Sequence, residues 1–194
     1  MLGEGAAMLV LEDWVHAMQR DARIRGELIG YGLSTDAGYI TRPTIGGQAW
    51  SMALALQSAQ LGPERIGDIN AHGTATAAND AVESGAIKQV FGERAYRIPV
   101  SSTKSMQGHL LGAAGAIELV ATLLALEAAT LPPAINLRVA NAQCDLDYVT
   151  EGARSVGRLE IAMSNAFAFR GTNAVLVCRT ARDDSGGTSS DSKG

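Results

Sequence analysis

The stretch SSTKSMQGHLLGAAGAIE, residues 101–118, decides how the rest of this sequence is interpreted. A short polar loop carries Lys104 and His109 and runs directly into an apolar segment. Between residues 110 and 126 the only charged residue is Glu118. A helix that is apolar all round is expected to be buried on every side. The pattern therefore predicts that a lysine and a histidine lie at the mouth of the most buried helix, with His109 in its first turn.

Composition indicates one sizeable globular domain. The 194 residues are 46% hydrophobic and 19% charged, with a formal net charge of -4. This charge, and the lack of a basic stripe, disfavour nucleic acid or an anionic membrane as a partner. Residues 110–126 are also somewhat shorter than the roughly 20 residues that span a bilayer. We expect this segment to be a buried helix of a soluble protein.

The two cysteines, Cys144 and Cys178, have no metal-ligand spacing. We expect both to be reduced structural thiols in the cytoplasm, and we expect no metal site. Residues 1–12 lack the basic region and cleavage pattern of a signal peptide, which agrees with that location.

Strands and helices are expected to alternate along the chain. Helices are predicted at residues 13–23, 48–61, 79–91 and 110–126, and strands at 6–12, 27–35, 65–71, 98–102, 146–149, 160–167 and 174–179. The last two strands flank a short loop and are expected to pair as a hairpin. This order predicts an α/β fold with a mixed sheet. Residues 181–194 are polar and rich in glycine and serine, which is typical of a disordered tail.

Three loops that follow predicted strands carry the candidate chemistry: residues 72–76, 104–109 and 167–173. Sites in α/β sheets gather at the carboxyl ends of strands. His72 and His109 could donate hydrogen bonds to a developing oxyanion and transfer protons, and a helix dipole would keep His109 neutral. The alternative is that both only satisfy backbone groups. Two strand-end histidines among three favour the functional interpretation, and His16 is expected to be solvated.

Glu118 has two interpretations, as a carboxylate paired with Lys104 or as a residue on the helix surface. Burial favours the ion pair, because an isolated buried carboxylate would become protonated. The glycines at 108, 112 and 115 are too widely spaced for a phosphate loop, and we expect them to allow close helix packing.

Five segments together resemble a known family: GEGAAMLVLE, NAHGTAT, SSTKSMQGHLLGAAGAIE, PPAINL and SNAFAFRGTNAVLV. They are similar to the C-terminal half of a β-ketoacyl-[acyl-carrier-protein] synthase, the elongating condensing enzyme of type II fatty acid synthesis, or of a related polyketide ketosynthase. The resemblance runs unbroken from residue 3 to about residue 179. It implies a thiolase-like, layered α-β-α-β-α fold, with residues 13–180 as its C-terminal domain and residues 1–12 as a remnant strand of a missing N-terminal half.

The resemblance implies catalytic roles for three residues. His72 and His109 match the histidines that bind the malonyl thioester carbonyl and stabilise the enolate. Lys104 matches the lysine that organises the site electrostatically. Thr74 and Thr76 match threonines that hydrogen-bond the phosphopantetheine arm of the substrate.

Further matches concern the gate and the structure around the site. Phe169 matches the gating phenylalanine, whose backbone N–H also lines the oxyanion hole. The family's Gly-Phe-Gly-Gly loop here contains Ala168 and Arg170 in place of two glycines, which puts loop gating in question. Asn70, Glu118, Ser164 and Asn165 match a buried structural cluster that holds a monovalent cation in some members, and Glu83 is placed beside it.

The family implies no cofactor of its own, because the growing chain is carried on the phosphopantetheine of acyl carrier protein. The implied partners are acyl carrier protein and either the missing N-terminal half or a full-length ketosynthase, and the complete enzyme is expected to be a homodimer. The nucleophilic cysteine belongs to the other half, and neither Cys144 nor Cys178 matches its context, so the chain alone is expected to be inactive.

Two other functions remain open. A non-catalytic partner resembling a chain length factor is disfavoured, because such a scaffold has no use for both histidines and Lys104. Acyl transfer of the thiolase type is disfavoured by the spacing of the HGT-T and KS-x-x-GH motifs.

Overall fold

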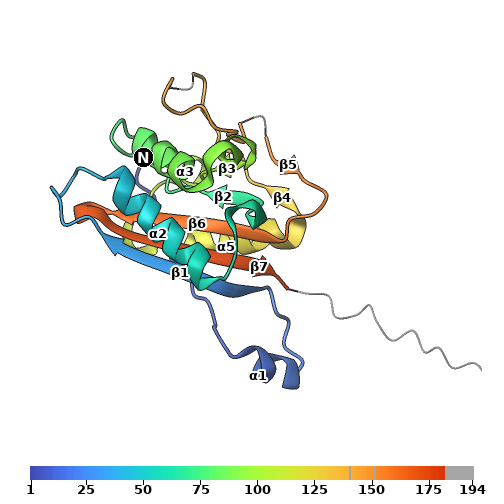
Figure 1. The fold of residues 1–194 in the computed structure, drawn as a ribbon. Coiled ribbons are helices and arrows are strands. Elements are labelled where there is room, and N and C mark those ends of the chain that lie inside the picture. Colours follow the sequence, from blue (N-terminus) through green and yellow to red (C-terminus); the bar gives the residue numbers. More distant parts are fainter. Residues whose placement is uncertain (140, 151, 182–194) are drawn as a thin grey trace, which may run out of the picture.

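The computed structural model describes residues 1–139, 141–150 and 152–181. A five-stranded sheet in the order β1-β7-β6-β2-β3 forms its centre (Figure 1). The strands are β1 (Gly26–Thr35), β7 (Thr172–Thr180), β6 (Ile161–Ala168), β2 (Asp68–Asn70) and β3 (Val100–Ser101). The first three pair antiparallel, whereas β6, β2 and β3 pair parallel. The predicted mixed sheet and the β6–β7 hairpin are therefore confirmed.

Helices cover both faces of this sheet. The helices α2 (Ile45–Ser58) and α3 (Asn79–Phe91) lie on one face, and α5 (Ala114–Ala128) lies on the other (Figure 1). Alternation along the strands explains both layers, since neighbouring residues point to opposite faces. Met163 and Val177 pack in the apolar cluster with α2 and α3, while Ala162 and Cys178 pack in the cluster with α5.

The helix α2 lies unusually close to β1. A Cβ atom on Gly32 would be 2.0 Å from the backbone oxygen of Ser51, so only glycine permits this approach. Thr44 begins the helix, because its side chain accepts a hydrogen bond of 3.0 Å from the Gly47 N–H.

Shorter elements complete the described part of the chain. These are α1 (Trp14–Gln19), α4 (Lys104–Gln107), β4 (Thr130–Leu131), β5 (Arg154–Ser155), and the 3-10 turns η1 (Pro63–Arg65), η2 (Gly92–Arg97), η3 (Leu111–Ala113) and η4 (Phe169–Gly171). The helix α1 is shorter than predicted. Asp13 caps it by accepting from the Val15 and His16 N–H groups. His16 is exposed, as expected, and lies 2.7 Å from Glu12.

Two predicted strands are wrong. Residues 6–12 form no strand, because no strand among the described residues lies beside them to supply hydrogen bonds, and Met8 and Val10 are exposed. With the rest of the described chain, residues 146–149 make a single isolated bridge, between Tyr148 and Val100. Both segments have the apolar pattern of a strand, but neither forms a ladder of hydrogen bonds with a strand in the described part of the chain. The tail predicted at 181–194 lies outside the described residues, apart from residue 181.

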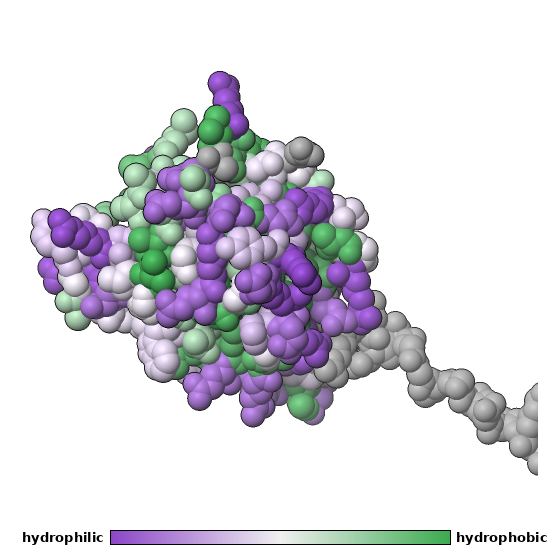
Figure 2. Space-filling view, turned by 45° about the horizontal axis from the view of Figure 1, so that its top comes forward, coloured by the Kyte–Doolittle hydropathy of each residue, from purple (hydrophilic) through white to green (hydrophobic). Residues whose placement is uncertain are grey.

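The expectation that the apolar helix is buried on every side is also wrong for this chain. Glu118, Leu119 and Thr122 face the sheet and are buried, whereas Leu124 is 53% exposed. By length and composition alone, Leu111–Ala128 could cross a membrane, and 33% of it is buried in the structure. A core helix packed against one sheet meets the same two criteria. The face of the molecule shown in Figure 2 is mostly hydrophilic, with hydrophobic residues in small separate patches.

Candidate active site

Two histidines from separate loops meet at one edge of the sheet. His72 follows β2, and His109 follows the turn that ends α4, itself just after β3. Their rings lie 5.5 Å apart between centroids at an interplanar angle of 87°. The Phe167 ring lies 5.9 Å from His72. Because β2 and β3 are parallel neighbours, their carboxyl ends bring these loops together.

Glu83 of α3 holds the first of these loops. Its Oε1 accepts a 2.8 Å hydrogen bond from the His72 backbone N–H, and its Oε2 accepts one of 2.9 Å from the Gly73 N–H. Gly73 has φ +41°, and a Cβ atom there would lie 2.6 Å from the Ser102 side chain. The Ser102 hydroxyl donates to the Gly73 carbonyl at 3.0 Å, which ties the two loops together. The glycine of the HGT motif is therefore required by the backbone.

Both histidines are neutral near pH 7. Burial, with smaller effects from Lys104 and His109, lowers the pKa of His72 to about 3. Burial, followed by Lys104, also lowers the pKa of His109. The sequence-based explanation by a helix dipole is wrong, because His109 lies before η3 and α5 and not in the first turn of the helix.

A backbone contact selects the tautomer of His109. The Leu111 N–H donates a 3.2 Å hydrogen bond to the His109 Nδ1. A neutral imidazole whose Nδ1 accepts must carry its proton on Nε2. His109 therefore offers an Nε2–H donor, while the buried Nδ1 of His72 has no partner among the described residues.

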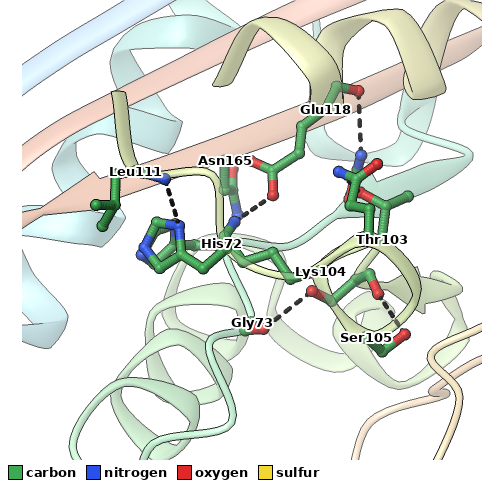
Figure 3. Close-up of polar contacts among 12 residues, drawn as sticks. His72, Gly73, Thr103, Lys104, Ser105, Leu111, Glu118 and Asn165 are labelled. Carbon is green, nitrogen blue, oxygen red and sulfur yellow. Dashed lines mark hydrogen bonds and ion pairs between the residues drawn. The ribbon is translucent and has the colours of Figure 1, made fainter. Parts of the chain in front are cut away.

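Lys104 and Glu118 form a buried ion pair beside the histidines (Figure 3), as expected from the sequence. Lys104 is 7% exposed and Glu118 is 1% exposed. Burial raises the pKa of Glu118 to about 7, against the opposing effect of the Lys104 ammonium. The second Glu118 oxygen, Oε2, has no partner among the described residues. The ammonium thus places a fixed positive charge next to two neutral imidazoles.

The residues matched to one buried structural cluster lie on two faces of the sheet. The Asn70 side chain donates to the Glu118 backbone oxygen at 3.2 Å and to Thr122, on the α5 side. Ser164 pairs with Asn70 across the strands and shares that face. Asn165 points to the opposite face and donates to Glu83 Oε1 at 3.1 Å. Strand alternation already separates residues 164 and 165, so the sequence contained this signal.

The residues matched to pantetheine binding and gating lie nearer the surface. The Thr74 and Thr76 hydroxyls lie 2.9 Å apart. Thr76 also accepts from the Asn79 N–H at 3.2 Å, where α3 begins. Phe169 in η4 is 70% exposed. Of the two aromatic residues in this loop region, Phe167 contacts the His72 ring.

The sequence interpretation missed the network that anchors the loop around Phe169. Asp36 accepts from the Asn173 amide at 2.9 Å and from the Thr44 N–H at 2.9 Å. Its own N–H donates to the Gly171 carbonyl at 3.0 Å. These contacts join the segment after β1 to the β6–β7 connection. Residues 36 and 173 are far apart in the sequence, and no local pattern indicates their pairing.

Only one of the two departures from the glycine-rich loop is strained. Ala168 has φ -129°, an extended conformation open to any residue. Arg170 has φ 63° and ψ 20°, the left-handed region that favours glycine. Its side chain is exposed, and its N–H donates to the Ile40 carbonyl at 2.9 Å.

We expect Arg170→Gly to raise the free energy of unfolding by about 0.5–1 kcal/mol, because relief of left-handed strain exceeds the entropic cost of glycine. Ala168→Gly is the matched control and should lower it by about 0.5–1 kcal/mol, since no strain is relieved there. Urea unfolding of both variants measures this. Equal losses in the two variants would show that Arg170 is not strained.

Among the described residues, no group of three or more His, Cys, Asp or Glu side chains could hold a metal ion. The groups gathered here are two neutral imidazoles, an ammonium and buried carboxylates. Such a set suits the stabilisation of a negative charge that develops on a carbonyl oxygen.

Residues 25–138, more than half of the chain, match the family described as "Beta-ketoacyl synthase, C-terminal domain". The chain belongs to the β-ketoacyl synthase family. It is 49% identical over 179 residues to 3-oxoacyl-[acyl-carrier-protein] synthase 2 of Coxiella burnetii, covering 91% of this chain and 43% of that protein. It is 48% identical over 177 residues to nodulation protein E of Rhizobium meliloti, covering 91% of this chain and 44% of the relative.

Solved ketosynthases have the same fold. The ishigamide ketosynthase/chain length factor matches with a TM-score of 0.90 and 43% identity, covering 94% of this chain and 44% of that chain. A type II polyketide synthase acyl carrier protein in complex with its ketosynthase matches with a TM-score of 0.84 and 40% identity. This match covers 88% of this chain and 42% of that chain. The thiolase-like α/β fold is therefore confirmed. The chain spans less than half the length of these β-ketoacyl synthase relatives.

Proposed function

We propose that this chain is the C-terminal part of a β-ketoacyl-[acyl-carrier-protein] synthase that performs decarboxylative Claisen condensation. The observation that carries the proposal is the pair of neutral imidazoles, 5.5 Å apart beside the Lys104 ammonium. The malonyl thioester carbonyl would accept a hydrogen bond from His109 Nε2–H, and the enolate formed as carbon dioxide leaves would be stabilised there. The nearby ammonium disfavours imidazolium and favours the enolate charge.

The substrate would arrive on the phosphopantetheine arm of acyl carrier protein, with Thr74 and Thr76 as hydrogen-bonding groups and with no separate cofactor. One solved relative is a ketosynthase in complex with its acyl carrier protein, which supports this partner. We further propose a cytoplasmic location and a homodimer for the complete enzyme.

The acyl nucleophile would come from outside this chain. Cys178 lies in β7 and is buried, and burial raises its thiol pKa to about 12, so it carries almost no thiolate near pH 7. Cys144 is half-buried and lies in the loop before residue 146, close to Tyr148. Neither position follows a strand-to-helix turn near the histidines. We therefore expect no condensation product from the chain alone.

A chimera tests this function. The matching part of the Coxiella burnetii synthase would be replaced with this chain, and condensation of acyl and malonyl thioesters of acyl carrier protein would be measured. We expect activity in the chimera, and a loss of about 10²–10³-fold on His72→Asn or His109→Asn. His16→Asn is the matched control, because His16 is exposed in α1, and should change little.

Condensation product from the 194-residue chain alone would contradict the expectation that the nucleophile comes from outside this chain. Two structures of ketosynthases with chain length factors are among the matches, so a non-catalytic partner is the second candidate. A chimera that folds but is inactive with both histidines present would favour that scaffold role.

A further inference from the structure

The first residues of the chain lie against the backbone of His109. The His109 N–H donates to the Met1 carbonyl at 3.0 Å, and the Gly3 N–H donates to the His109 carbonyl at 3.1 Å. Leu2 forms an isolated parallel bridge with His109. Residues 1–3 thus occupy both backbone hydrogen-bonding groups of this histidine, although they are about a hundred positions away.

This contact depends on two glycines that pass each other closely. A Cβ atom on Gly3 would lie 2.4 Å from the Gln107 backbone oxygen. A Cβ atom on Gly108 would lie 3.0 Å from the Gly3 nitrogen and 3.1 Å from its Cα. Gly108 also has φ +81°. Backbone atoms cannot yield as a flexible side chain does, so a larger residue at position 3 must displace residues 107–109 or break the contacts that residues 1–3 make with them.

Such a displacement would reach the imidazole ring. The ring orientation depends on the 3.2 Å hydrogen bond from the Leu111 N–H to the His109 Nδ1. This bond requires the backbone of residues 109 and 111 to keep its relative position. The ring also packs edge-on against His72. A shift of a few tenths of an ångström at residues 107–109 acts on both contacts.

We propose that Gly3 is a positioning residue that holds His109, through the hydrogen bonds of residues 1–3 and the Gly3–Gly108 contact, in the orientation its chemistry requires. This rests on the proposed function, in which His109 binds the substrate carbonyl. Gly3 itself touches no substrate. Its effect is local to one of the two histidines.

Residue-resolved reactivity of the histidines tests the proposal without any substrate. Diethyl pyrocarbonate modifies neutral imidazoles, and His16, His72 and His109 lie on three different tryptic peptides. In the whole chain, we expect Gly3→Ala to raise the modification rate of His109 several-fold at neutral pH, with His72 and His16 unchanged. Gly112→Ala is the matched control, because a Cβ atom there meets nothing within 4 Å.

A second variant separates positioning from misfolding. A chain that begins at Glu4 removes both hydrogen bonds to His109 without adding a Cβ atom, and it should show the same selective rise. Unchanged His109 reactivity in both variants would overturn the proposal. So would an equal rise at buried His72 in both, because residues 1–3 would then only stabilise the fold. The reactivity test measures no condensation, so it is independent of the chimera experiment. An inactive chimera would refute the proposed function and would leave the reactivity of His109 as evidence for positioning.

Discussion

Lys104→Met is expected to lower the free energy of unfolding by about 3–5 kcal/mol, because it leaves the Glu118 carboxylate buried without a partner. Glu118 is almost fully buried, and Oε2 already has no partner among the described residues. Removing the ammonium forces Glu118 either to remain charged in the interior or to bind a proton. Urea unfolding near pH 8 measures the loss.

The double variant with methionine at both 104 and 118 is the control. Two apolar side chains of similar volume remove both charges, so most of the loss should be recovered. The deficit of Lys104→Met should also shrink at about pH 5, where protonation of Glu118 costs less. A deficit that is equal at both pH values, or a double variant as unstable as the single one, would show that the ion pair is not the cause.

Asp68→Asn is expected to stabilise the chain at about pH 8 by on the order of 2–4 kcal/mol. Asp68 begins β2, is 1% exposed, and its Oδ1 has no partner among the described residues. Burial raises its pKa to about 7, from 3.8. The folded state therefore holds a proton that the unfolded state has lost, and stability from Asp68 falls as pH rises between these values. Asparagine stays neutral and removes that loss.

The measurement is the free energy of unfolding of wild type and variant between about pH 5 and pH 8. Glu118 titrates in the same range, so the difference between the two curves isolates Asp68. Asp145→Asn is the control, because a hydrogen bond with Lys88 lowers the pKa of exposed Asp145. Asp145 is therefore ionised in both the folded and the unfolded state between about pH 5 and pH 8, and its replacement should leave the slope unchanged there. Parallel curves for wild type and Asp68→Asn would contradict a protonated Asp68.

Local patterns predicted most of the sheet and its helices. Two predicted strands flanking a short loop identified the β6–β7 hairpin, and the helix predicted at 79–91 ends at Phe91, before Gly92 with φ 55°. The same patterns failed at residues 6–12 and 146–149, where an apolar segment lacks a neighbour for a full ladder. A strand depends on a partner that its own residues do not specify, whereas a helix satisfies most of its hydrogen bonds internally.

The candidate site, like the fold, was predictable from the sequence only in part. The sequence by itself determined the two strand-end histidines and the pairing of Lys104 with Glu118, because burial of a charge demands a partner. Only the tertiary structure decided that Asn165 contacts Glu83 and that Asp36 joins Asn173. It also placed residues 1–3 against His109. These contacts connect residues far apart in the chain, and their geometry follows from strand order and helix packing, which no local pattern of residues encodes.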